Sequence, residues 1–421
     1  MKKLMLATVL AAAMAAVQAV QAAGASFADF DARAKAGEPM SVVYLGASLT
    51  YSANASDPGT TGFRGLMSDY LLKRYPKTQF RFHDAAIGGT PSRLGLFRLE
   101  RDVLSKKPDL VFLDFLCNDG GDNVNPENTC AYEQIIRTLI EKGIAVEQLH
   151  FTFRWWAEGD ANYLRRVPRQ RLYANLGAYY STPCADTWSV LKPLLDAKKT
   201  TFDQVWPVDG GHPADYGYTI FFESARLAFE QAVADKLVCE CPAEPLYGSV
   251  SDVRRLALAG EKLPTGWKTE IPFRNSLWFD GLSSRWMGDV AVATGASAAF
   301  ETKAACNYIG LFGEADDNAA LMAELTVDGK ATKHAFWCGA GGRLFVFRDS
   351  FLDGWQKGEG AERTIALKAL ADEKKPNGQL RVESILTATF KPTAKGLEIA
   401  KNYGRKDFNL DAIDHARGQK K

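Results

Sequence analysis

Three residues that can together perform nucleophilic catalysis stand out in the chain. Ser48 directly follows an apolar run, and Asp209 and His212 lie within Asp209-Gly210-Gly211-His212-Pro213 near the end of the same half. A serine hydroxyl is a weak nucleophile unless a base lies within hydrogen-bonding reach. His212 lies in a Gly/Pro-punctuated loop and is the candidate base, while Asp209 can hold the tautomer of its ring. The set predicts the chemistry of ester hydrolysis.

Acyl transfer also needs donors aimed at the oxyanion that develops on the carbonyl. Gly88-Gly89 follows a second predicted strand, where a glycine lets a backbone N–H approach substrate. Asn118 follows a third predicted strand and offers a side-chain amide. Each segment alone is also typical of a turn. All of these groups at successive strand ends form a more specific pattern than any one of them.

Residues 41–250 alternate strand-like and helix-like segments. The predicted strands are 41–45, 79–86, 109–116 and 149–153, and the predicted helices lie at about 63–71, 96–103, 132–142 and 216–237. Repeated units of this kind favour a parallel sheet covered on both faces. Ligand sites of such sheets gather at the carboxyl ends of the strands, which is where Ser48 falls.

After about residue 241 the pattern changes to short apolar runs separated by turns. These runs are 308–312, 323–327, 344–347 and 380–385, and Asp328-Gly329 predicts a hairpin. This half is expected to be a β-sandwich or jelly roll. The predicted divisions are a signal peptide at 1–22, an α/β domain at 23–241, a linker at 242–249, a β-sandwich at 250–393 and a polar tail at 394–421.

The first residues predict export. Met1-Lys2-Lys3 precedes an apolar stretch that ends near Val20-Gln21-Ala22, which resembles a signal-peptide cleavage site. No cysteine precedes Cys117, which excludes a lipoprotein anchor at that site, and no later stretch is long and apolar enough to span a bilayer. The mature protein is therefore expected in the periplasm of a bacterium or outside the cell.

Composition excludes several classes of function. Lys plus Arg number 51 against 50 Asp plus Glu, with no strongly one-signed window, so neither nucleic acid nor a charged membrane surface is an expected partner. The five histidines are scattered and no Cys/His cluster has ligand spacing, so no metal and no cofactor are predicted. Seven cysteines fit an oxidising compartment, and Cys306 with Cys338 is one plausible disulfide. The oligomeric state stays open.

The order Ser48, Gly89, Asn118, Asp209 and His212 resembles the SGNH (GDSL-type) esterase and acylhydrolase family. The first block reads Gly-Ala-Ser-Leu-Thr, which departs from Gly-Asp-Ser-Leu at its second position, while the Asp-x-x-His block matches best. The resemblance covers roughly residues 41–237 and implies a flavodoxin-like three-layer α/β/α fold. It implies a double displacement, in which an oxyanion hole made of the serine N–H, the glycine N–H and the Asn amide stabilises the tetrahedral intermediate.

Substrates of this family range from lipids to acetylated sugars. Export favours carbohydrate, as does an appended β-domain similar to the modules of SGNH-type carbohydrate acetyl esterases. Arg154, Trp155 and Trp156 follow a strand end, where aromatic rings can stack on sugars, although core packing is an equal alternative. The expected activity is removal of acyl groups, most simply acetyl, from carbohydrate. The alternatives are a lysophospholipase-like or general short-chain acylhydrolase and a non-catalytic glycan-binding protein.

Overall fold

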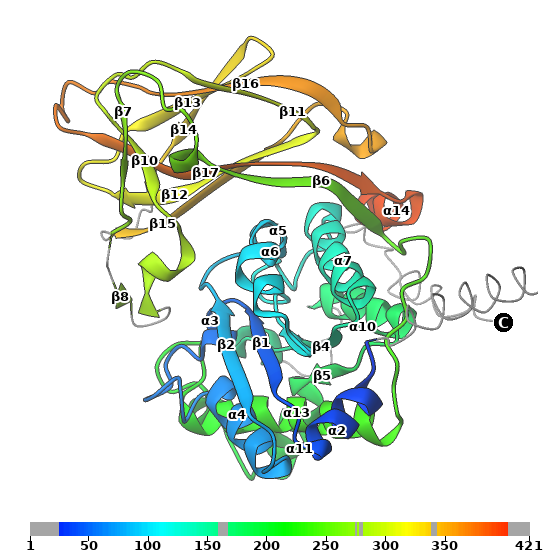
Figure 1. Ribbon diagram of the computed structural model, residues 1–421. Helices are drawn as coiled ribbons and strands as arrows, with labels where there is room; N and C mark the ends of the chain where they lie inside the picture. Colours follow the sequence, from blue (N-terminus) through cyan, green and yellow to red (C-terminus); the bar gives the residue numbers. More distant parts are fainter. Residues whose placement is uncertain (1–24, 159–166, 274–275, 278–280, 338–342, 403–421) are drawn as a thin grey trace, which may run out of the picture.

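The computed structural model describes residues 25–158, 167–273, 276–277, 281–337 and 343–402. An α/β part (residues 25–241) contains a five-stranded parallel sheet, and a β part (residues 248–402) lies against it (Figure 1). The strands of the parallel sheet run in the order β2-β1-β3-β4-β5, which is the flavodoxin-like order and confirms the predicted fold class. They are β1 (Met40–Gly46), β2 (Phe80–Ala86), β3 (Leu110–Leu113), β4 (Ala145–His150) and β5 (Cys184–Asp186).

Helices cover both faces of this sheet. On one face α2 (Phe27–Ala36), α4 (Phe63–Arg74), α11 (Thr187–Asp196) and α13 (Asp215–Ala234) pack together, and on the other α5 (Ser92–Phe97), α7 (Pro126–Glu141) and α10 (Pro168–Tyr180) do so (Figure 1). The shorter helices are α3 (Ser48–Tyr51), α6 (Leu99–Asp102), α8 (Arg154–Ala157) and α12 (Phe202–Val205). The result is the expected three-layer arrangement.

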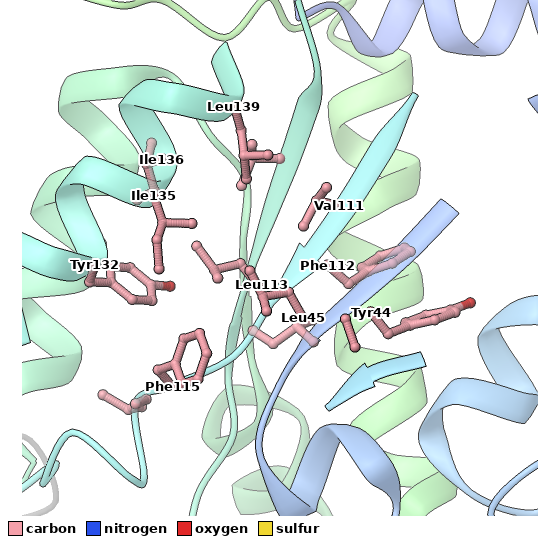
Figure 2. Close-up of a cluster of buried hydrophobic side chains, with 14 of the residues drawn as sticks. Tyr44, Leu45, Val111, Phe112, Leu113, Phe115, Tyr132, Ile135, Ile136 and Leu139 are labelled. Carbon is pink, nitrogen blue, oxygen red and sulfur yellow. The ribbon is translucent and has the colours of Figure 1, made fainter. Parts of the chain in front are cut away.

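The central strands are buried along their whole length because helices cover both faces. Figure 2 shows side chains of β1 and β3 meeting those of α7. The rings of Tyr44 and Phe112 stack at 5.2 Å between adjacent strands. A strand covered on both sides reads as a continuous apolar run, which is why β1 and β3 were predictable.

The bounds of β3, β4 and β5 differ from the strands predicted from the sequence. The strand expected at 149–153 is β4, which begins earlier and ends at His150, because the buried polar residues Glu147 and Gln148 interrupt its apolar pattern. The short strand β5 was not predicted at all. The strand expected at 109–116 is regular only over β3, and the chain after it turns toward Asn118.

The β part is an antiparallel sandwich, as predicted. One sheet has the order β15-β12-β17-β10-β7, with β6 also paired to β17, and the other has the order β11-β16-β13-β14. The strands are β6 (Gly248–Ala257), β7 (Trp267–Glu270), β10 (Val290–Thr294), β11 (Phe300–Cys306), β12 (Tyr308–Asp316), β13 (Met322–Val327), β14 (Lys330–Ala335), β15 (Arg343–Phe351), β16 (Ala361–Ala369) and β17 (Gln379–Pro392), beside a small pair, β8 (Ser276–Leu277) and β9 (Gly281–Leu282). A separate apolar core fills the space between the two sheets.

The two parts are joined closely. The buried carboxylate of Glu133 on α7 accepts the backbone N–H groups of Leu246, Tyr247 and Gly248 at 2.5, 2.8 and 2.9 Å, so the predicted linker is fixed to the α/β part. Phe97 of α5 stacks on Tyr308 of β12 at 5.4 Å. One apolar core therefore continues from the first part into the second.

Three further expectations have outcomes here. The predicted polar tail begins with a helix, α14 (Ala394–Asn402), which buries Ile399. Of this predicted tail, residues 403–421 lie outside the described residues. Cys306 is a free thiol among the described residues, and Cys338, its suggested disulfide partner, lies outside them. In the part of the chain that the structure describes, no helix has the length and apolar character needed to cross a bilayer. Residues 1–22 also lie outside it.

Candidate active site

A continuous hydrogen-bonded chain joins the three residues predicted to perform catalysis. Ser48 Oγ lies 2.9 Å from His212 Nε2. On the other side of the ring, His212 Nδ1 lies 3.2 Å from each carboxylate oxygen of Asp209. With its proton on Nδ1, the imidazole presents a lone pair on Nε2 to the serine hydroxyl. This is the geometry of a nucleophile, a base and an orienting carboxylate.

A tight turn places Ser48 at the end of β1. The chain folds back from Gly46 into the short helix α3, which Ser48 begins. A Cβ at Gly46 would lie 2.0 Å from Thr50 Oγ1 and 2.6 Å from the Asp114 carbonyl oxygen, so only glycine fits there. Thr50 Oγ1 in turn donates to the buried Asp114 carboxylate at 2.9 Å, which fixes α3 to the end of β3.

The carboxylate of Asp209 is held by donors from two segments. One oxygen accepts the backbone N–H groups of Gly211 and His212 at 2.7 Å each, and the other accepts Asn54 Nδ2 at 2.9 Å. Burial raises the pKa of Asp209, but these hydrogen bonds and the nearby imidazole outweigh it and hold the pKa below its usual value. Asp209 therefore stays ionised and faces the ring as an acceptor.

Asn54 is a site residue that the sequence did not reveal. Its Nδ2 donates to the Asp209 carboxylate and also, at 3.1 Å, to the carbonyl oxygen of His212. Its backbone has a φ of 69°, a left-handed conformation that Asn adopts more readily than most residues. Asn54 thus joins the segment after the nucleophile to the base loop. A single Asn in a polar loop carries no pattern by which this contact could be found.

The three predicted oxyanion donors follow the carboxyl ends of β1, β2 and β3. β2 and β3 flank β1 on either side, so the turns that follow them adjoin Ser48. Gly89 has a φ of 70°, which favours glycine, and a Cβ there would meet nothing within 4 Å. Within the described residues, the N–H groups of Ser48 and Gly89 and the amide of Asn118 donate to no protein acceptor.

Asp119 links two of these turns. Its buried carboxylate accepts the backbone N–H of Ser92 at 2.8 Å and the hydroxyl of Tyr173 at 2.5 Å. Ser92 begins α5, just after the turn that contains Gly89, while Asp119 adjoins Asn118. Burial raises the pKa of Asp119, although the nearby Arg169 charge and these donors oppose it. Asp119 had no predicted role.

The predicted sugar-binding residues have three different environments. Trp155 is 51% exposed, and its ring lies against Gly210, where a Cβ would come within 3.0 Å of it. Trp156 is 6% exposed and its ring packs in the apolar core, which is the alternative that the sequence had left open for it. Arg154 makes ion pairs with Glu158 and Asp203 at 2.7 and 2.6 Å, which occupy its guanidinium within the protein.

The comparisons agree with this geometry. Residues 44–220, most of the α/β part of this chain, match the model of the GDSL-like lipase/acylhydrolase family. The matched segment contains Ser48, the turns with Gly89 and Asn118, and the loop with Asp209 and His212. A comparison with curated proteins gave no match.

Solved structures extend the similarity to the β part. A two-domain esterase active on acetylated mannans, co-crystallised with mannopentaose, aligns with a TM-score of 0.67 and 20% identity over 86% of this chain and 94% of its own. A second structure of a two-domain esterase with that activity gives 0.66 and 19% over 87% and 95%. An acetylxylan esterase from Geobacillus stearothermophilus aligns over 46% of this chain and 96% of its own, with a TM-score of 0.39 and 18% identity. The first two show that the whole two-part fold recurs.

Proposed function

We propose that this protein is an exported serine esterase that removes acetyl groups from carbohydrate. The observation that carries the proposal is the unbroken chain of hydrogen bonds from Ser48 through His212 to Asp209. The family supports acyl hydrolysis, and the signal-peptide pattern of residues 1–22 supports export. No metal or cofactor takes part in the proposed reaction.

The reaction follows from the positions of these groups. As Ser48 Oγ bonds to the ester carbonyl carbon, its proton passes to His212 Nε2, and the carbonyl oxygen becomes an oxyanion. The N–H groups of Ser48 and Gly89 and the Asn118 amide stabilise that charge. The carbon–oxygen bond to the sugar then breaks, and the sugar oxygen takes the proton from His212. Water then attacks the carbonyl carbon of the acyl-enzyme and gives a proton to His212. The bond between that carbon and Ser48 Oγ breaks, Ser48 Oγ takes the proton from His212, and acetic acid is released.

Two observations favour carbohydrate as the substrate. The two-part fold is shared with an esterase described as active on acetylated mannans. Trp155 presents an exposed ring beside the loop that joins Asp209 to His212. A flat aromatic face next to the catalytic base suits stacking on a sugar ring.

The test is acetate release from acetylated mannan and acetylated xylan, with the Ser48→Ala variant as the blank. A parallel series of 4-nitrophenyl esters of increasing acyl length distinguishes the alternatives. We expect acetate to be released and the acetyl ester to be the best of the series. Activity that rises with acyl length would instead favour a lysophospholipase-like enzyme. Glycan binding by the wild-type protein without hydrolysis of any ester would favour a binding protein.

Replacing Asn118 by Ala tests the oxyanion hole. The amide stabilises charge that exists only in the transition state, so we expect kcat to fall by about 10²–10³ with little change in KM. Kinetics on 4-nitrophenyl acetate measure both constants. Asn128→Ala is unsuitable as a control because its side chain supports Asp119, whereas Asn318→Ala changes an exposed turn of the β part and should leave kcat unchanged. A decrease in kcat of less than tenfold for the Asn118 variant would contradict the assignment of Asn118 to the oxyanion hole.

Replacing Trp155 by Ala tests sugar recognition. If the ring contributes about 1 kcal/mol of stacking to glycan binding, its loss raises KM for an acetylated oligosaccharide about fivefold. Turnover of 4-nitrophenyl acetate, which has no sugar, should change less than twofold. Trp337→Ala, which removes an exposed tryptophan from the β part, is the matched control. Equal losses on both substrates would show that Trp155 supports the base loop instead.

A further inference from the structure

One side chain of the β part reaches the edge of the catalytic sheet. β2 is the edge strand of the parallel sheet, so the carbonyl groups on its outer side have no strand partner among the described residues. Arg285, in the short helix η4 (Ser283–Trp286), donates NH1 to the carbonyl of Asp84 at 3.1 Å and NH2 to that of Ala86 at 2.7 Å. Ala86 is the last residue of β2, and the turn with Gly89 follows it.

The same guanidinium contacts the helix that begins at the nucleophile. Its central carbon lies 5.8 Å from the ring centre of Tyr51, the last residue of α3. Arg64 of α4 lies 5.5 Å from the same ring. The carboxylate of Asp84 pairs with both guanidinium groups, at 3.5 Å for Arg64 and 3.3 Å for Arg285. Arg285 therefore touches the end of β2 and the helix of Ser48 at once.

The backbone of η4 is itself fixed at the junction. Arg101 of α6 donates to the carbonyl groups of Arg285 and Trp286 at 3.2 and 3.1 Å. From the other side, Arg255 of β6 donates to the Trp286 carbonyl at 3.3 Å. Trp286 is buried and packs edge-on against Phe345. These contacts hold the guanidinium of Arg285 in one place.

We propose that Arg285 is a positioning residue of the active site, supplied by the β part. It sets the turn that carries Gly89 relative to the helix that carries Ser48, and so fixes the distance between an oxyanion donor and the nucleophile. The inference rests on the proposed function, because it assigns Arg285 a part in the same reaction. The planar fork of arginine suits this role, since it spans two carbonyl groups of one strand edge while its face lies over a ring.

The first test is the Arg285→Ala variant assayed with 4-nitrophenyl acetate. Small displacements of catalytic groups are costly, and a misplaced oxyanion donor weakens the transition state more than the ground state. We expect kcat to fall about ten- to hundredfold with KM within about twofold of wild type. Arg285→Lys keeps the charge beside Asp84 but cannot span both carbonyl groups, so its kcat should lie between those of Ala and wild type.

Arg137→Ala is the matched control. Arg137, on α7 rather than beside β2, holds the segment that connects the two parts. It donates to the carbonyl groups of Pro242 and Ala243 at 2.8 and 3.2 Å and lies 5.9 Å from the ring centre of Tyr180. It should lower the melting temperature about as much as Arg285→Ala while leaving kcat of the folded enzyme unchanged. Equal kcat for the Arg137 and Arg285 variants would overturn the proposal.

A second readout separates this inference from the proposed function. A fluorophosphonate labels an activated serine and places a phosphoryl oxygen where the ester oxyanion would lie. We expect Ser48 to be labelled at least tenfold more slowly in Arg285→Ala than in Arg137→Ala. If the wild type hydrolyses no ester at all, the proposed function fails, and the labelling rates still decide the role of Arg285. Equal labelling rates would overturn that role whatever the substrate.

Discussion

Replacing Ser48 by Ala should abolish esterase activity, lowering kcat by about 10⁵–10⁶, because the serine and the imidazole act as a unit. The structure explains why so small a change has so large an effect. The hydroxyl is 2.9 Å from His212 Nε2, and no other described serine occupies such a position. Without it no acyl-enzyme can form, and the remaining groups can only bind the ester. Acetate release and 4-nitrophenyl acetate turnover both measure the loss.

The fold should survive this substitution. Ser48 is buried, but among the described residues its hydroxyl has only the imidazole as a hydrogen-bond partner, so removing it should change the free energy of unfolding by no more than about 1 kcal/mol. Ser68→Ala, which removes a serine hydroxyl bonded to Tyr44 on the far side of β1, is the control and should keep full kcat. Residual activity above 1% in a freshly purified Ser48→Ala protein would contradict the assigned nucleophile.

The second large effect is expected for Asp209→Asn, with a fall in kcat of about 10⁴. An amide cannot present two acceptor oxygens to the imidazole, and its NH₂ group favours the tautomer whose Nε2 carries the proton and cannot accept one from Ser48. The loss of charge also removes the stabilisation of the imidazolium that forms during the reaction. Asp209 lies 3.2 Å from Nδ1 through both oxygens, so either orientation of the new amide disturbs the ring.

Asp215→Asn provides a matched control for that experiment. Asp215 begins α13 just after the base loop and accepts the backbone N–H of Ser56 and the hydroxyl of Thr61 at 2.7 Å each, without contacting the imidazole. Its substitution should cost some stability and less than tenfold in kcat. If the two Asn variants lost activity equally, the effect of Asp209→Asn would reflect the structure of the loop rather than the orientation of His212.

The three hydrogen-bonded residues of the candidate site could be found from the sequence because each follows a strong local pattern. Ser48 comes directly after a strand buried on both faces, and Asp209 and His212 lie in one short loop bounded by glycine and proline. The topology then brings these segments close together, because neighbouring parallel strands have their carboxyl ends on the same side of the sheet. Gly89 and Asn118 were found by the same reasoning, and their assignment as oxyanion donors stays a prediction.

Other features escaped because no local pattern encodes them. Trp155 and Trp156 are adjacent in sequence, and only the direction in which α8 leaves the sheet decides that one ring is exposed and the other buried. β4 was misplaced because its buried Glu147 and Gln148 resemble surface residues. Arg285 contacts residues of β2 that lie about 200 positions earlier in the sequence. The sequence pattern around either segment does not indicate such a contact.

Glu133 has a consequence for any attempt to dissect the protein. Its buried carboxylate, on α7, accepts hydrogen bonds from four donors. One is the Tyr180 hydroxyl, and the other three are the backbone N–H groups of residues 246–248, which follow Pro245. A shortened protein ending at that proline would lose three of the four donors to this carboxylate, and we expect it to be less stable than the full chain. We therefore expect the α/β part to lose stability when it is excised, and swapping the sandwich for another would require a substitute for those amides.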